Sequence, residues 1–270
     1  MAFTLASIQK GQIIEPPRIA IYGKPGIGKT SWAAQAPNPI FLFTEKGRGR
    51  LNLKSFPLAR SWGDVTEAGR ALLDEEHEYK TFVIDGIDSL EPLIWAQTCA
   101  DGDSKGPKDQ IEDFGFGKGY NYALRYWREF LEMLDALHEE RGMAVILIAH
   151  AMVKTFKNPD GDDYDRYQVT VNDKAEPLIR KWVDCMLFAD YEIKVRKQEN
   201  AIDKSKGKAV KVYGDMNRLL YTEERPAFWA KNRYGLPPVL PLSWGDFADA
   251  MDAGIEKTEK VVEKLKKGAA

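Results

Sequence analysis

The sequence contains few of the residues that build disulfide or metal centres. Its 270 residues include only two cysteines, Cys99 and Cys185, and three histidines. The cysteines form no C-x-x-C pair, and three histidines are too few for an obvious metal cluster. These scarcities argue against a disulfide scaffold and a zinc module, and they favour a cytoplasmic protein in a reducing compartment.

Long apolar runs and an excess of one charge are also missing. No apolar segment approaches the ~18 residues that a transmembrane helix needs, so we expect no membrane partner. The first residues, MAFTLASIQKGQ, lack the basic and apolar regions of a signal peptide. The formal net charge is −2, so any binding to nucleic acid must rest on local basic patches rather than on overall attraction.

What the sequence does have is a glycine-rich phosphate-binding motif near its start. Residues 23–30 read GKPGIGKT and fit G-x-x-x-x-G-K-[ST] at every fixed position. They follow an apolar run at 18–22, expected to be a strand, and precede a segment that can open a helix. The expected nucleotide-binding residues are Gly23, Lys24, Pro25, Gly26, Ile27, Gly28, Lys29, Thr30 and Ser31.

The residue types of this motif match the chemistry of a nucleoside triphosphate. Glycines let backbone N–H groups approach phosphates closely, and a helix N-terminus adds partial positive charge. Lys29 can reach the β- and γ-phosphates, and the Thr30 hydroxyl can ligate Mg²⁺. ATP and Mg²⁺ are therefore the expected cofactors.

The rest of the chain alternates apolar runs with amphipathic segments, which predicts an α/β fold with a mostly parallel central sheet flanked by helices. Further strands are expected at 40–44, 81–85, 143–149 and 185–195, and helices at 64–75, 90–97, 122–140 and 174–182. Segments 210–213 and 218–221 predict an antiparallel extension. Polar loops are expected at 101–119 and 152–172. We divide the chain into an N-terminal extension (1–16), an ATPase core (17–242) and a lysine-rich helical tail (243–270).

Polar residues follow the expected strands, at the edge where ligands bind in open α/β sheets. Asp85 is suited to hold Mg²⁺ together with Thr30, and Asp88 either assists it or, as we favour, caps the next helix. Glu45 can orient an attacking water, unless it is only an exposed loop charge. His150 can sense the γ-phosphate, or it is a structural histidine at a strand end.

The order of these parts resembles the RecA-like P-loop ATPase core. In that family a glutamate follows the strand after the P-loop helix, matching Glu45, and an aspartate ends the next strand, matching Asp85. A polar residue then senses nucleotide and couples to DNA, and His150 stands where many members carry glutamine. Two loops of the family face DNA, and they match residues 101–120 and 152–172.

A second element of the resemblance lies far downstream. Residues 231–235 read KNRYG and resemble the K-N-R-F-G motif of RadA-type proteins and the related basic element of hexameric helicases. In those families the basic residues reach the nucleotide of the neighbouring subunit, which implies a catalytic role in trans for Lys231 and Arg233. The resemblance thus implies a homo-oligomer, either a ring or a filament.

Aromatic and basic residues in the two loops are candidates for DNA contact, because rings stack on bases and lysines neutralise phosphates. The first loop is also acidic, and its rings can pack on the protein instead. An aspartate cluster at 160–165 lacks the remaining features of a calcium loop. The candidates are Lys105, Lys108, Phe114, Phe116, Lys118 and Tyr120 in the first loop, and Lys154, Phe156 and Lys157 in the second.

The narrower resemblance is to small phage-encoded RecA-like ATPases linked to single-strand annealing and recombination. It implies an Mg·ATP-dependent ATPase that binds single-stranded DNA in the bacterial host cytoplasm, with a single-strand-binding protein as a candidate partner. Two alternatives stay open: a nucleotide-dependent switch or loader with little hydrolysis, and a small-molecule kinase. The kinase is disfavoured because the sequence shows no arginine-rich lid.

Overall fold

The computed structural model describes residues 15–47, 49–197 and 210–254. Most of the expected N-terminal extension, most of the charged turn at 197–208 and the lysine-rich part of the tail lie outside the described residues. Within the described part, no helix combines the length and apolarity needed to cross a membrane.

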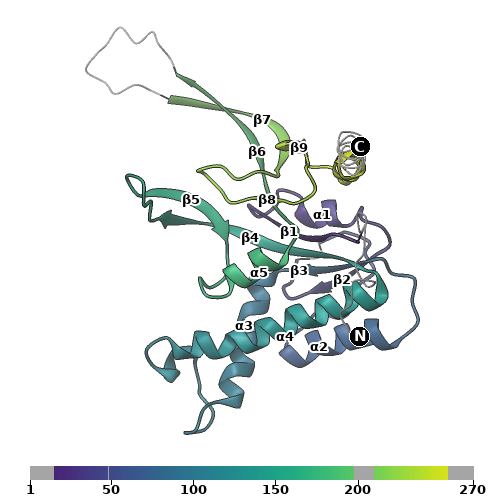
Figure 1. Ribbon diagram of the computed structural model, residues 1–270, viewed down its shortest axis with the longest axis vertical. Helices are drawn as coiled ribbons and strands as arrows, with labels where there is room; N and C mark the ends of the chain where they lie inside the picture. Colours follow the sequence, from purple (N-terminus) through teal and green to yellow (C-terminus); the bar gives the residue numbers. More distant parts are fainter. Residues whose placement is uncertain (1–14, 48, 198–209, 255–270) are drawn as a thin grey trace, which may run out of the picture.

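The centre of the fold is a mostly parallel sheet, as the sequence predicts (Figure 1). Its order is β2-β3-β4-β1-β6, all parallel, continued by the antiparallel strands β7 and β9. β8 pairs with β6, and β5 pairs with β4. The bounds are β1 (Arg18–Gly23), β2 (Pro39–Phe43), β3 (Thr81–Asp85), β4 (Ala144–Phe156), β5 (Tyr164–Val169), β6 (Cys185–Lys197), β7 (Val210–Tyr221), β8 (Lys231–Asn232) and β9 (Val239–Pro241).

Helices cover both faces of the sheet (Figure 1). One face carries α2 (Trp62–Asp74), α3 (Ile87–Asp101), α4 (Lys118–Arg141) and α5 (Glu176–Trp182). The other carries α1 (Lys29–Ala33) and the helical residues 244–254. A short 3-10 helix, η2 (Ile111–Phe114), lies in the first polar loop.

Strand alternation divides the core between these faces. In β1, Ala20 and Tyr22 pack in the cluster under α4, whereas Ile19 and Ile21 pack in the cluster with α1. The start of the tail joins the second cluster, because the Phe247 ring lies 5.3 Å from the Trp32 ring of α1. The sheet is thus buried on both faces, and its two ends are left for polar residues.

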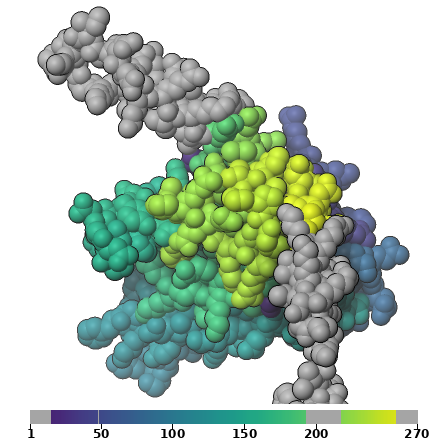
Figure 2. All heavy atoms as spheres, turned by 45° about the horizontal axis from the view of Figure 1, so that its top comes forward, coloured from purple at the N-terminus to yellow at the C-terminus, as the bar shows by residue number. Residues whose placement is uncertain are grey.

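The second polar loop is a correction to the sequence analysis. β4 continues past the sheet to Phe156 and pairs antiparallel with β5, with Ala151 opposite Val169 and Phe156 opposite Tyr164. This hairpin projects from the body at the left of both views (Figures 1 and 2). The segment was expected to be a loop because it is polar, but a solvated two-stranded hairpin tolerates polar residues when side chains alternate between faces.

Candidate nucleotide-binding site

The glycine-rich loop leaves the carboxyl end of β1 and opens α1, as the motif predicts. Gly26 and Gly28 have φ angles of 76° and 111°, which favour glycine. Gly23 permits a close approach, because an added Cβ would lie 2.2 Å from the Ala189 carbonyl oxygen. The loop is therefore built around backbone conformations that other residues would strain.

Lys29 is folded back into this loop. Its Nζ donates to the carbonyl oxygens of Gly23 (2.9 Å) and Lys24 (3.1 Å), and the residue is 6 % exposed. Burial lowers the pKa of the Lys29 ammonium below its ordinary value, while the nearby carboxylates of Asp85, Asp88 and Glu45 oppose this effect. The lysine is thus held at the loop, where phosphates would replace its carbonyl partners.

Thr30 and Asp85 meet beside the lysine, as predicted. The Thr30 hydroxyl donates to Asp85 Oδ2 at 2.8 Å, and Asp85 is 6 % exposed. Burial raises the pKa of the Asp85 carboxyl, and the charge of Glu45 adds to this rise. A hydroxyl and a carboxylate suit the oxygen-preferring Mg²⁺, and a cation here would relieve the cost of the buried charge. The residues present therefore fit a magnesium ion.

These groups open onto a cavity of about 350 Å³ at the carboxyl end of the sheet. Strand order explains the convergence, because β3 and β4 lie between β2 and β1 and bring the residues that follow them to one edge. Glu45 and His150 line the cavity together with Lys29, Thr30 and Asp85. The lining residues are Gly26, Gly28, Lys29, Thr30, Ser31, Glu45, Gly47, Gly49, Arg50, Leu51, Asp85 and His150.

The prediction that Asp88 caps α3 is wrong. The residue before this helix is Gly86, and no side chain caps it. Asp88 lies in the first turn and turns to His150 instead: its Oδ2 is 2.8 Å from the imidazole Nδ1, and its Oδ1 accepts the His150 backbone N–H at 3.3 Å. The spacing of three residues after Asp85 gave no sign of this pairing, since the partner is brought by β4.

Two polar contacts hold the phosphate loop from outside, and the sequence analysis missed both. Lys24 Nζ lies 2.9 and 3.0 Å from the two carboxylate oxygens of Asp190 on β6. The Arg218 guanidinium on β7 donates to the Ile27 carbonyl at 3.3 Å. Lys24 thus contributes to the loop through its backbone and through a tether to the sheet.

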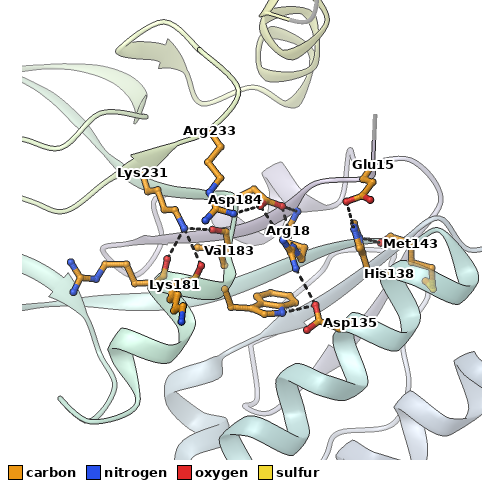
Figure 3. A network of polar contacts seen from close by, with 12 residues as sticks. Glu15, Arg18, Asp135, His138, Met143, Lys181, Val183, Asp184, Lys231 and Arg233 are labelled. Carbon is orange, nitrogen blue, oxygen red and sulfur yellow. Dashed lines mark hydrogen bonds and ion pairs between the residues drawn. The ribbon is translucent and has the colours of Figure 1, made fainter. Parts of the chain in front are cut away.

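Lys231 and Arg233 lie at the opposite, amino end of the sheet, within the polar network of Figure 3. β8 pairs with the first residues of β6, beside the start of β1. Lys231 Nζ donates to the carbonyls of Arg180, Lys181 and Val183 at 2.9, 3.2 and 2.5 Å. Lys231 is thus tied to the C-terminal end of α5 within its own chain.

Arg233 is less enclosed than Lys231. Its Nη1 pairs with Asp184 Oδ1 at 3.0 Å, and its side chain is 52 % exposed. The length of β1, five residue steps, separates this region from the phosphate loop by roughly 16 Å. The position excludes contact with the chain's own nucleotide and leaves the predicted contact with a neighbour's nucleotide as a hypothesis.

The first DNA-candidate loop divides into packed and exposed residues. The ring of Phe114 is buried with Ile111, and Tyr120 donates to Glu112 at 2.5 Å and packs on Trp95. Lys108 pairs with Asp103 at 2.8 Å. Phe114 is thus buried and offers no free stacking face, as the alternative of packing on the protein allows, whereas Tyr120 is half-buried and its contact with DNA stays a prediction.

Phe116 is the exception in this loop. It is fully exposed, and its φ of 49° lies between two glycines that also have positive φ. A cavity of about 720 Å³ is lined by Phe114 and Lys118, two residues to either side of Phe116, and by the further basic residues Lys105, Arg125 and Arg128 together with Asp101 and Asp103. Arg125 pairs with Asp101, so the lining is of mixed charge, and the exposed ring of Phe116 is the feature of this loop that best retains the chemistry expected for DNA.

In the hairpin, the predicted residues have partners within the chain. Lys154 pairs with Asp173 at 2.5 Å, and Lys157 pairs with Asp163. The ring of Phe156 packs against Tyr164 at 5.3 Å between centroids. DNA would have to compete with these contacts.

A comparison with protein-family models matches residues 15–234 to the AAA domain. A curated relative is the SPbeta prophage-derived uncharacterized protein YorG of Bacillus subtilis (strain 168), which is 28% identical over 137 residues. The match spans 49% of this chain and 40% of that protein, so the chain covers less than half of its relative's length. The family match covers the phosphate loop, Glu45, Asp85, His150, Lys231 and Arg233.

Proposed function

The chain belongs to the AAA domain family of P-loop ATPases, and we propose that it is an Mg·ATP-dependent ATPase that binds single-stranded DNA in phage recombination or annealing. The observation that carries the proposal is the meeting of five residues around one cavity. Lys29 and Thr30 open α1, whereas Glu45, Asp85 and His150 each come from a different segment, and all five line the hollow at the carboxyl end of the sheet.

Each of these residues has a distinct task in the proposed reaction. Lys29 leaves its two carbonyl partners to bind phosphate, and Thr30 and Asp85 hold Mg²⁺, which when bound screens the phosphate charge. Glu45 orients the attacking water. Its carboxylate is already positioned by the Ser89 hydroxyl, which donates to Oε2 at 3.1 Å. His150, fixed by Asp88, donates to the γ-phosphate.

Hydrolysis is completed by a neighbouring subunit in this proposal. Arg233 lies at the amino end of the sheet, with its side chain half exposed and about 16 Å of β1 between it and its own phosphate loop. A guanidinium supplied in trans would stabilise charge on the transferring phosphoryl group and make turnover depend on assembly. Lys231 then serves as a brace that fixes the neighbouring backbone.

Single-stranded DNA is proposed to engage the first loop at Phe116. The exposed ring offers a stacking surface, and Lys105 and Lys118 of the nearby cavity offer phosphate contacts. The prophage origin of the relative named above agrees with a role in phage DNA metabolism.

The second candidate is a nucleotide-dependent switch or loader with little hydrolysis. The internal pairing of Lys108, Lys154 and Lys157 favours it, because these lysines are engaged with carboxylates rather than presented to DNA. Such a protein would bind Mg·ATP through the same residues and act through a protein partner.

Turnover of the full chain, measured with Mg·ATP in the presence and absence of single-stranded DNA, tests the proposal. We expect stimulation by DNA, and we expect Phe116→Ala to weaken DNA binding by about 1–3 kcal/mol, with Phe116→Tyr as the ring-retaining control. Lys29→Ala should abolish ATP binding. Slow turnover that DNA leaves unchanged would instead support the switch, and phosphate transfer to a small acceptor would support a kinase.

A further inference from the structure

Three metal-ligating side chains meet at the nucleotide cavity: Glu45 and His150 line it, and Asp88 contacts His150 from beside it. One ligand atom from each of Glu45, Asp88 and His150 lies within 4.8 Å of the other two. The three come from different elements: Glu45 follows β2, Asp88 opens α3, and His150 belongs to β4. Since β2, β3 and β4 are adjacent in the sheet, their relative positions are set by the core.

We propose that Glu45, Asp88 and His150 form a binding site for a divalent transition-metal ion of the Zn²⁺ or Co²⁺ class. The imidazole distinguishes this set from the magnesium pair. Mg²⁺ prefers oxygen ligands and water, whereas an imidazole with two carboxylates suits later divalent metals. The chain would therefore have two neighbouring cation sites with different preferences.

The local geometry needs only a small adjustment to accept such an ion. Asp88 Oδ2 and His150 Nδ1 are 2.8 Å apart, within hydrogen-bond distance. Ligands around a tetrahedral zinc lie roughly 3.4 Å from one another when the bonds are about 2.1 Å. A metal would enter between the two groups and bind the Nδ1 lone pair, the imidazole hydrogen then being carried on Nε2, and it would draw in the Glu45 carboxylate as the third ligand.

Charge also favours a cation at this place. Three carboxylates, from Glu45, Asp85 and Asp88, act together on the single ammonium of Lys29. Arg50 is the other lysine or arginine among the residues that line the cavity, so three carboxylates stand against two cations. Binding a divalent ion among Glu45, Asp88 and His150 would neutralise this excess without removing the hydrogen bond between Thr30 and Asp85.

The composition of the chain makes the site easy to isolate. There are three histidines in the sequence, and both cysteines are buried. His77 lies in the loop between α2 and β3, and its Nε2 is 2.9 Å from the Leu72 carbonyl oxygen. His138 is buried on α4. His77 therefore supplies a matched control for substitutions of His150.

The test is a titration of the untagged, metal-stripped full chain with Co²⁺ in the absence of nucleotide, followed by visible absorption. We expect saturation at one equivalent per chain. His150→Ala and Asp88→Asn should each weaken binding by at least about tenfold, because each removes a direct ligand. His77→Ala should bind as the wild type does, and excess Mg²⁺ should leave most of the Co²⁺ bound.

Several results would overturn the proposal: the absence of a saturable signal, equal binding by His150→Ala and wild type, or displacement of Co²⁺ by an equal concentration of Mg²⁺. Circular dichroism of each variant checks that the fold is kept. Lys29→Ala separates this proposal from the ATPase proposal, since it should lose ATP binding and retain Co²⁺ binding. A second readout is Zn²⁺ inhibition of turnover, expected because the ion occupies Glu45 and His150.

Discussion

The two ends of the central sheet hold similar residues in opposite electrostatic states. At the amino end, Asp184 accepts hydrogen bonds from Arg18 through its backbone N–H, Nε and Nη2, and a further bond from Arg233. Burial alone would raise the pKa of the Asp184 carboxyl, but the bonds and charge of Arg18 lower it below its ordinary value. The Asp184 carboxylate is thus a matched charge, by which we mean that arginine side chains compensate it.

At the carboxyl end the balance is reversed. Asp85 is as buried as Asp184, but its hydrogen-bond donor is the neutral Thr30 hydroxyl, and Glu45 adds like charge. Its pKa is raised. The comparison indicates that the amino end is arranged for stability, whereas the carboxyl end keeps uncompensated charge that a metal and a nucleotide would relieve.

The largest expected effect is on turnover, and it comes from substituting Arg233, which tests whether the amino end of the sheet also has a function. If Arg233 completes a neighbour's site, Arg233→Ala should lower turnover of the assembled protein by about 10³-fold and leave ATP binding intact. Lys231→Ala is the matched control, since it should reduce thermal stability rather than chemistry, through loss of its three carbonyl contacts. Unchanged turnover in Arg233→Ala would make the amino end purely structural.

Glu91, a buried carboxylate of α3, gives the next largest effect, which is on stability. Burial raises the pKa of Glu91 on α3 to about 7, although Asn172 donates its backbone N–H to both carboxylate oxygens. The folded state therefore binds a proton that the unfolded state releases near pH 4.5, so stability falls as pH rises from about 4.5 to 7. The expected loss is about 2.5 kcal/mol between pH 5 and pH 8.

Glu91→Gln should remove this pH dependence. The variant should therefore gain stability relative to the wild type between pH 5 and pH 8, as measured by the free energy of unfolding in urea. Glu112→Gln, at an exposed position in the first loop, is a suitable control. Parallel pH profiles for the wild type and Glu91→Gln would show that Glu91 ionises without penalty.

At the amino end the predicted effect on stability is smaller, and the stability is lost as the pH falls rather than as it rises. Asp184→Asn should lower the free energy of unfolding by about 2 kcal/mol at pH 7, because it leaves Arg18 and Arg233 with weaker acceptors. A carboxyl whose pKa is lowered in the folded state contributes stability when the pH is above its ordinary pKa, near 3.8. This stability is lost as the pH falls through the pKa of the folded state. The difference between variant and wild type should therefore shrink below pH 4.

Much of the carboxyl end was predictable from the sequence, and little of the amino end was. Lys29, Thr30 and Asp85 lie in or directly after recognisable local patterns, so spacing along the chain was enough. The Arg18–Asp184 pair joins residues 166 positions apart. No local pattern encodes such a pair, because it depends on β1 and β6 lying side by side.

The errors have the same origin. Asp88 was assigned to a helix cap because its local sequence allows one, but β4 brings His150 within reach of its carboxylate. Phe114 was expected to face DNA because it alternates with glycines, yet η2 turns it into a small cluster with Cys99 and Ile111. Polarity predicted a loop at 152–172, where strand pairing at long range forms a hairpin.

The comparison is tested most directly by substituting the carboxylate at the carboxyl end. Asp85→Asn should raise the free energy of unfolding of the nucleotide-free protein by about 1 kcal/mol, because it removes a buried charge whose pKa is raised and keeps an oxygen that can accept from Thr30. The same change should abolish Mg²⁺-dependent hydrolysis. Urea unfolding without Mg²⁺ and a turnover assay measure the two effects. A variant that is both inactive and less stable would show that Asp85 is a matched charge like Asp184, and the proposed division between the two ends of the sheet would be wrong.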